Sequence, residues 1–208
     1  MSDKRRKYDQ FTVTASQFDE LQQEVFAALQ ENLSAVLTYH SVQHTRDVLF
    51  AATTIANKEQ VSKYDAQKIR LAALFHDTGF MVTYDEHEEA SCKYARKVLA
   101  QYKASTENIN HICEMIMATK IPQTPLDHCS EILADADLEY LGTEDFGRIS
   151  SLLFDELKNR NSSLNLTDWN QIQIKFLTQH KYFTQYCQST KSPVKNAHLQ
   201  ALVRGSEG

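Results

Sequence analysis

Glycine and proline are scarce in this chain, which has five glycines and three prolines among its 208 residues. Both residue types interrupt helices, so long stretches without them favour helical structure. No apolar run approaches the length that is needed to cross a membrane. The basic opening segment, residues 1–7, has no apolar region behind it and therefore does not resemble a signal peptide. These features predict a cytoplasmic, mainly helical protein without a membrane segment.

The chain also lacks an excess of positive charge and any paired cysteine motif. Its formal net charge is −5, which argues against a broad basic surface for nucleic acid. The four cysteines stand apart, with no CxxC spacing, at positions 92, 113, 129 and 187. They are therefore expected to be reduced thiols, and not a disulfide framework or a zinc knuckle.

Helical periodicity runs through most of the chain. Apolar residues recur at helical spacing between residues 16 and 38, with Ser16 as the expected N-cap. Further helices are predicted over residues 41–58, 65–77, 86–102, 105–118, 127–141 and 143–158. Another is expected after a cap at Thr167 or Asp168, and a short one near residues 197–203. Because no strand pattern or internal repeat is apparent, the sequence predicts an all-α, single-domain helical bundle.

The most informative residues are the adjacent pair His76 and Asp77, at the end of the predicted helix over residues 65–77. They follow an apolar run, residues 71–75, that is expected to be buried. Burying an imidazole beside a carboxylate costs several kcal/mol, on the order of 2–7, unless a partner satisfies both groups. A divalent metal ion is the partner that suits this combination best.

Further metal-competent side chains lie on other predicted helices. His40 and His44 are four residues apart, so both point in the same direction if they begin a helix. Asp137 has leucines four residues to either side, whereas Asp135 has glutamates there. Asp137 is therefore predicted to be a ligand, and Asp135 to orient the ligands or balance charge from behind them. This mixed nitrogen and oxygen set suits Mn, Fe, Co, Ni or Zn better than Mg.

The order of His44, the pair His76–Asp77 and Asp137 resembles the HD superfamily of metal-dependent phosphohydrolases, which are all-helical. The resemblance covers about residues 35–145 and continues more weakly to the C-terminus, as in uncharacterised bacterial HD proteins. It implies one HD domain over residues 1–208, with a metal-site core at 35–145 and C-terminal helices, 146–208, packed on it. The Gly-Tyr-Pro element of one HD branch is absent, so hydrolysis of cyclic-di-GMP is not implied.

The resemblance also assigns roles to residues around the four ligands. His40 matches the residue that protonates the leaving group in related phosphodiesterases. His87 and His111 resemble the two extra histidines that bind a second metal in some branches, in which case Asp77 would bridge both ions. Lys120 could pair with a phosphate. The residues alone leave other readings open: a solvated helix start for His87, a half-buried rim position for His111 and an ordinary surface lysine for Lys120.

The implied function is hydrolysis of a nucleotide or another small phosphate ester by metal-activated water. One alternative is an HD-fold oxygenase with a di-iron site, which His87 and His111 keep open. The other is a non-catalytic nucleotide-binding domain. The remaining histidines, at positions 128, 180 and 198, are predicted to lie at the surface.

Overall fold

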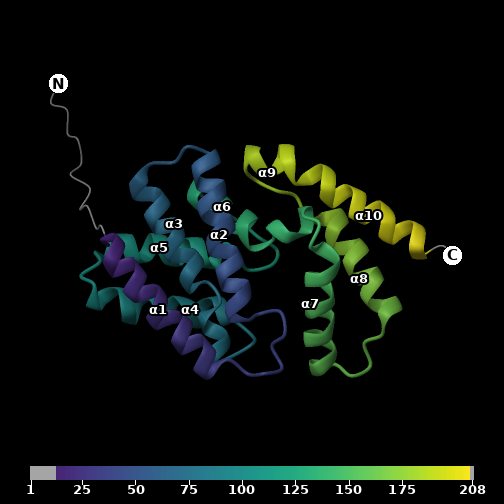
Figure 1. Cartoon of the computed structure of the whole chain (residues 1–208), viewed down its shortest axis with the longest axis horizontal. Coiled ribbons are helices and arrows are strands. Elements are labelled where there is room, and N and C mark those ends of the chain that lie inside the picture. The colour runs from purple at the N-terminus through teal and green to yellow at the C-terminus, as the bar shows by residue number, and fades with distance from the viewer. Residues whose placement is uncertain (1–12, 207–208) are drawn as a thin grey trace.

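The computed structural model describes residues 13–206, and within this range its regular structure is entirely helical (Figure 1). The helices are α1 (Ala15–Asn32), α2 (Val42–Lys58), α3 (Lys63–Phe75), α4 (His87–Gln101), α5 (Thr106–Met117), α6 (His128–Asp137), α7 (Phe146–Arg160), α8 (Leu166–Gln179), α9 (Gln185–Thr190) and α10 (Ser192–Ser206). Two short 3₁₀ helices, η1 (Thr78–Met81) and η2 (Glu139–Gly142), follow α3 and α6. The all-α prediction is confirmed. The basic segment 1–7 lies outside the described residues.

Capping side chains explain where several helices begin. Thr14 starts α1 with a capping box: its hydroxyl oxygen accepts the N–H of Gln17 (3.2 Å), and the Gln17 side chain accepts the N–H of Thr14 (2.9 Å). The predicted cap at Ser16 is therefore wrong, and α1 also ends at Asn32, short of residue 38. The α8 cap is Asn165, whose side chain accepts the N–H of Asp168 (3.0 Å). In both helices the true cap lies two residues or more before the predicted one.

Helix α3 lies at the centre of the N-terminal helices and packs against α2, α5 and α6. The apolar run at residues 71–75 is fully buried, as predicted. In Figure 1 the helices α1 to α6 gather on one side of the molecule, and α7, α8 and α10 on the other. His76 and Asp77 follow directly after the buried helix α3, and Asp77 lines a cavity that side chains of α7 and α8 also line.

The C-terminal helices attach through η2 and α9. Helix α9 packs on α2, while α7 and α10 pack on η2. Tyr186 donates its backbone N–H to the Glu59 carboxylate (2.7 Å), and the Tyr182 hydroxyl donates to the carbonyl of Leu138 (3.0 Å). No helix in the described range is long and apolar enough to span a membrane. All four cysteines are buried, and none is joined to another by a disulfide.

Two histidines that were predicted at the surface are partly buried. His198 contacts the carbonyl oxygen of Thr143 through Nε2 (2.8 Å). The His180 ring stacks on Phe176, and neither of its nitrogens has a hydrogen-bond partner among the described residues. Burial and the nearby charge of Lys195 lower the pKa of His180 to about 4. The prediction from sequence was wrong because these histidines are covered by contacts with distant parts of the chain, which local polarity does not reveal.

The buried His180 ring should make the protein sensitive to acid. Its folded-state pKa lies below the ordinary value, so the unfolded chain binds more protons between about pH 6.5 and pH 4. Acidification through this window should lower the free energy of unfolding of the wild type by about 2–3 kcal/mol more than that of His180→Phe. Urea titrations at several pH values measure this difference, with the exposed His128→Phe as the control. Parallel pH profiles for wild type and His180→Phe would contradict it.

Candidate metal centre

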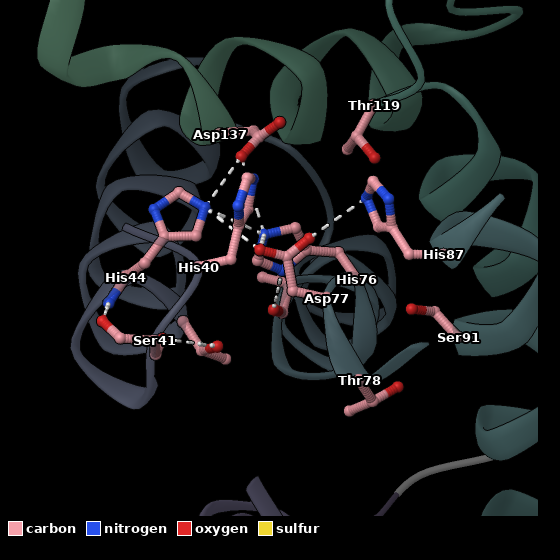
Figure 2. Close-up of polar contacts among 12 residues, drawn as sticks. His40, Ser41, His44, His76, Asp77, Thr78, His87, Ser91, Thr119 and Asp137 are labelled. Atoms are coloured by element: carbon pink, nitrogen blue, oxygen red, sulfur yellow. Dashed lines mark hydrogen bonds and ion pairs between the residues drawn. The ribbon is translucent and has the colours of Figure 1, made fainter. Parts of the chain in front are cut away.

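Three helix ends deliver four side chains to one point (Figure 2). Ser41 caps α2 and accepts the N–H of His44 (3.4 Å), which fixes His44 in the first turn of that helix. Helix α3 ends at Phe75, so His76 and Asp77 leave it in succession. Asp137 is the last residue of α6.

Five of the six separations among the four donor atoms lie between 3.1 and 3.6 Å. Nε2 of His44 is 3.1 Å from Oδ1 of Asp137, 3.3 Å from Oδ2 of Asp77 and 3.4 Å from Nε2 of His76. Nε2 of His76 is 3.3 Å from Oδ2 of Asp77 and 3.6 Å from Oδ1 of Asp137. Ligand bonds of about 2.0–2.2 Å place neighbouring donors about 3.0–3.5 Å apart. The spacing of this set therefore fits a divalent ion.

The hydrogen bonds behind the donors favour a cation in the same place. Nδ1–H of His76 donates to the carbonyl of Ala73 (2.8 Å), which leaves the lone pair of Nε2 facing the cluster. Oδ2 of Asp77 is buried and has no hydrogen-bond donor among the described residues. Lone pairs from His76 and Asp77 thus converge in a buried place, an arrangement that is costly unless a positive charge is present.

The pKa values of the metal-free cluster reflect this demand for positive charge. Burial lowers the pKa of His76, but the carboxylates of Asp77 and Asp137 outweigh it and raise that pKa well above its usual value. Burial raises the pKa of Asp137, but hydrogen bonds from His44 and His76 outweigh it and lower that pKa to about 2. In the metal-free protein a proton is therefore held where the donor set would otherwise hold a cation.

His87 extends the cluster on its other side. Nδ1–H of His87 donates to the carbonyl of Tyr84 (3.2 Å), so its Nε2 lone pair faces Oδ1 of Asp77 (3.6 Å) and Oε1 of Glu88 (3.6 Å). Asp77 therefore presents one oxygen to His44 and His76 and the other to His87, as Figure 2 shows. Glu88 was not identified from the sequence, where it appeared as one of several acidic residues at a helix start.

Gly79 allows η1 to approach the start of α4 closely. A Cβ atom at this position would lie 1.9 Å from the carbonyl oxygen of His87, so a larger residue would push α4 away. The next residue, Phe80, stacks on both His40 and His87, with ring centroids 4.1 Å and 3.9 Å apart. The short segment after Asp77 therefore sets the positions of both flanking histidines.

A buried glutamate on α7 holds His40. Oε2 of Glu156 accepts the backbone N–H groups of Tyr39 (2.9 Å) and His40 (3.0 Å), and Oε1 accepts Nδ1–H of His40. Burial lowers the pKa of His40, but the hydrogen bond to Glu156 outweighs it, so the pKa is raised. Sequence reasoning missed Glu156. It has Leu152 four residues before it but Arg160 four residues after it, so the criterion that selected Asp137 on α6 does not single it out.

Residues 41–139 match the family model described as the HD domain. The segment 41–139 is therefore identified as an HD domain. Its fold is also similar to the crystal structure of a predicted HD superfamily hydrolase from an uncultured Thermotogales bacterium, with a TM-score of 0.60 and 20% identity over 88% of this chain and 89% of that chain. At this level of identity the similarity concerns the fold alone. No curated protein gives a sequence match. The HD superfamily is one of metal-dependent hydrolases, and the His-His-Asp cluster lies within the matched range.

Asp135 does not support the donor cluster of the HD domain. Its fully buried carboxylate accepts the N–H of Phe183 (2.9 Å), the N–H of Thr184 (2.8 Å) and the Thr184 hydroxyl (2.6 Å). Residues two apart on a helix face different directions, and this face of α6 meets the chain before α9. The predicted role behind the ligands is therefore wrong, and so is the expectation that Asp135 is the more solvated of the two aspartates.

His111 and Lys120 also have partners of their own. Nε2–H of His111 donates to Oδ2 of Asp127 (2.6 Å), and Nδ1 of His111 accepts from Nζ of Lys68 (2.9 Å). Both ring nitrogens are thus engaged outside the cluster, so the structure does not bring His111 to His87. Nζ of Lys120 pairs with the Glu86 carboxylate at an exposed position (3.2 Å). A phosphate-binding role for Lys120 would require this ion pair to open.

Replacement of Asp135 should lower the stability of the protein, whereas replacement of Asp137 should lower its metal content. Asp135→Ala leaves three donors near α9 without an acceptor and should cost about 2–4 kcal/mol of stability while metal binding persists. Asp137→Asn should lose most of the bound metal with little loss of stability. Metal analysis and urea titration of both variants measure these effects. An equal loss of metal in the two variants would contradict the prediction.

Proposed function

We propose that this HD-domain protein is a metal-dependent phosphohydrolase that cleaves a small phosphate ester, with nucleotides among the candidate substrates. The observation that carries the proposal is the set of donor atoms from His44, His76, Asp77 and Asp137. Five pairs of these atoms lie 3.1–3.6 Å apart, and four of the five pairs join a histidine nitrogen to a carboxylate oxygen. When bound, a divalent ion supplies positive charge for phosphoryl oxygens and lowers the pKa of water. The two imidazoles favour Mn, Fe, Co, Ni or Zn over Mg.

His40 is the proposed general acid. It lines the same cavity as Asp77, His87 and Asp137, so its ring is accessible to a substrate at the cluster. The buried Glu156 carboxylate orients the ring through Nδ1 and favours its protonated form. A protonated His40 can give its proton to the departing alcohol oxygen, a contribution worth roughly 10²- to 10⁴-fold in rate.

His87 and Glu88 support a version of the site with two ions. Together with Oδ1 of Asp77 they form a second, smaller group of donors beside the first. The oxygenase alternative loses support, because His111, one of the two extra histidines it relied on, is engaged by Lys68 and Asp127. A non-catalytic role also loses support, because the donor set that suits a divalent ion lies beside a cavity that His40 also lines. The buried cysteines without disulfides favour a reducing compartment, and we propose that the protein is located in the cytoplasm.

A metal analysis joined to a substrate panel tests the proposal. The purified protein is loaded in turn with Mn²⁺, Fe²⁺, Co²⁺, Ni²⁺ and Zn²⁺ and assayed against nitrophenyl monoesters and diesters and nucleoside phosphates. Phosphate or alcohol release that depends on metal and is lost in Asp137→Asn is the expected result. Stoichiometric metal with no release from any ester, or oxygen consumption by the iron-loaded protein, would refute the proposal.

A further inference from the structure

One cavity joins the donor cluster to the C-terminal helices. It has a volume of about 250 Å³, and His40, Asp77, His87 and Asp137 line its polar end. Its other end is formed by apolar side chains of α7 and α8, namely Leu153, Leu157, Trp169, Ile172 and Phe176. A molecule whose phosphate sits at the cluster would therefore place the rest of its atoms against α7 and α8.

Lysine and arginine side chains are missing from the wall of this cavity. Among the described residues that line it, none is a lysine or an arginine. Lys120 is adjacent in sequence to the lining residues Thr119 and Ile121, but its ammonium group pairs with Glu86. Additional phosphates need such charges, because each carries negative charge that must be compensated in a partly dry site. The cavity therefore suits one phosphate group and not a polyphosphate chain.

Hydrogen-bonding groups are also few at the end formed by α7 and α8. The polar side chains there, Ser150 and Gln173, are both buried, and the serine hydroxyl donates to the glutamine carbonyl oxygen. The Gln173 amide nitrogen is directed at Asn170 (3.4 Å). A nucleobase carries several polar edge atoms, which would lose their hydrogen bonds to water here without finding new partners. An apolar group has no such cost.

We infer that the substrate is a monophosphate ester of an apolar alkyl or aryl alcohol, whose organic group occupies the end of this cavity between α7 and α8. This inference rests on the proposed function, because the phosphate is placed at the donor cluster. The volume is sufficient, since an apolar cavity of about 150 Å³ can hold a benzene ring.

Binding of non-hydrolysable alkylphosphonates tests this assignment without relying on turnover. The series runs from methyl- to hexylphosphonate, with the Mn²⁺-loaded protein in a calorimeter. Each buried methylene should lower Kd about 3- to 4-fold until the cavity is filled. Trp169 is the chain's single tryptophan and lines the cavity, so its fluorescence should change with hexylphosphonate more than with methylphosphonate.

A pair of variants on α8 locates the binding site. Ile172 lines the cavity and is 46% exposed, whereas Leu166 is 64% exposed and lies outside it. Ile172→Asp places a charge at the apolar end and should weaken hexylphosphonate binding by at least about 10-fold. Leu166→Asp makes the same chemical change on the same helix and should leave that affinity as it is. Equal effects of the two substitutions would overturn the assignment.

The outcomes separate the inference from the proposed function. Affinity that does not change with chain length, or tighter binding of adenosine monophosphate than of hexylphosphonate, overturns the inference even if esters are hydrolysed. Chain-length-dependent binding supports the inference, and the parallel assay with alkyl phosphates then decides the proposed function. If phosphonates bind in this manner but no phosphate ester is cleaved, the phosphohydrolase proposal fails and the apolar site stands.

Discussion

Replacement of Asp77 by alanine should abolish metal binding and reduce phosphate ester hydrolysis by at least about 1000-fold. Of the four donor residues, Asp77 lies between the pair His44 and His76 on one side and His87 on the other. Its Oδ2 is near His44 and His76, and its Oδ1 is near His87. Its removal therefore takes away a ligand and one of the two carboxylates, Asp77 and Asp137, whose negative charge attracts a cation to His44 and His76. Loss of several kcal/mol of charge stabilisation corresponds to about three or more powers of ten in rate.

The helical fold should survive this substitution. The Asp77 side chain makes no capping hydrogen bond to η1, and α3 is held by its fully buried apolar residues. Metal content, turnover and far-ultraviolet circular dichroism of Asp77→Ala measure the three effects. His111→Ala is the matched control, because His111 is a metal-competent residue whose partners lie elsewhere, and it should keep its metal. Full metal occupancy in purified Asp77→Ala would refute the assigned role.

Helix content was predictable from the sequence because it depends on local patterns. The run at residues 71–75 is apolar on every side, and such a segment must be buried whatever the rest of the chain does. The placement of His76 and Asp77 followed from it, since polar residues at the end of a buried helix need a partner. Boundaries were less predictable, as the capping box at Thr14 shows, because several serine and threonine residues compete for the N-cap.

The residues that were misplaced or missed depend on contacts between distant parts of the chain. Asp135 and Asp137 differ in function because a segment almost fifty residues later returns to α6 and occupies the face of Asp135. His111 finds Lys68 on α3, a pairing that no spacing along the chain reveals. Glu156 contacts His40 although 116 positions separate them in the sequence. Local periodicity identifies which residues are buried, but the tertiary arrangement decides which of them meet.

Glu156 should act through His40, and its replacement should alter the pH dependence of catalysis. The carboxylate accepts Nδ1–H of His40 and raises the pKa of that ring against the effect of burial. In Glu156→Gln the negative charge is lost, and an amide N–H can donate to Nδ1 in its place. The pKa of His40 should therefore fall, so the protonated acid disappears at a lower pH than in the wild type. The basic limb of the pH–rate profile should move towards acid by the same amount.

The dependence on leaving group separates a positioning role from a purely structural one. Alkyl phosphates release a basic alkoxide and need a proton, so Glu156→Gln and His40→Ala should reduce their hydrolysis by roughly 10²- to 10⁴-fold. Nitrophenyl phosphate releases a weakly basic phenolate, so both variants should hydrolyse it at a rate much closer to that of the wild type. Their metal content should be unchanged. Asp155→Asn alters the neighbouring, exposed carboxylate of α7 and serves as the control. Equal losses on both kinds of ester would mean that Glu156 only supports the fold, and loss of metal in His40→Ala would make His40 a ligand.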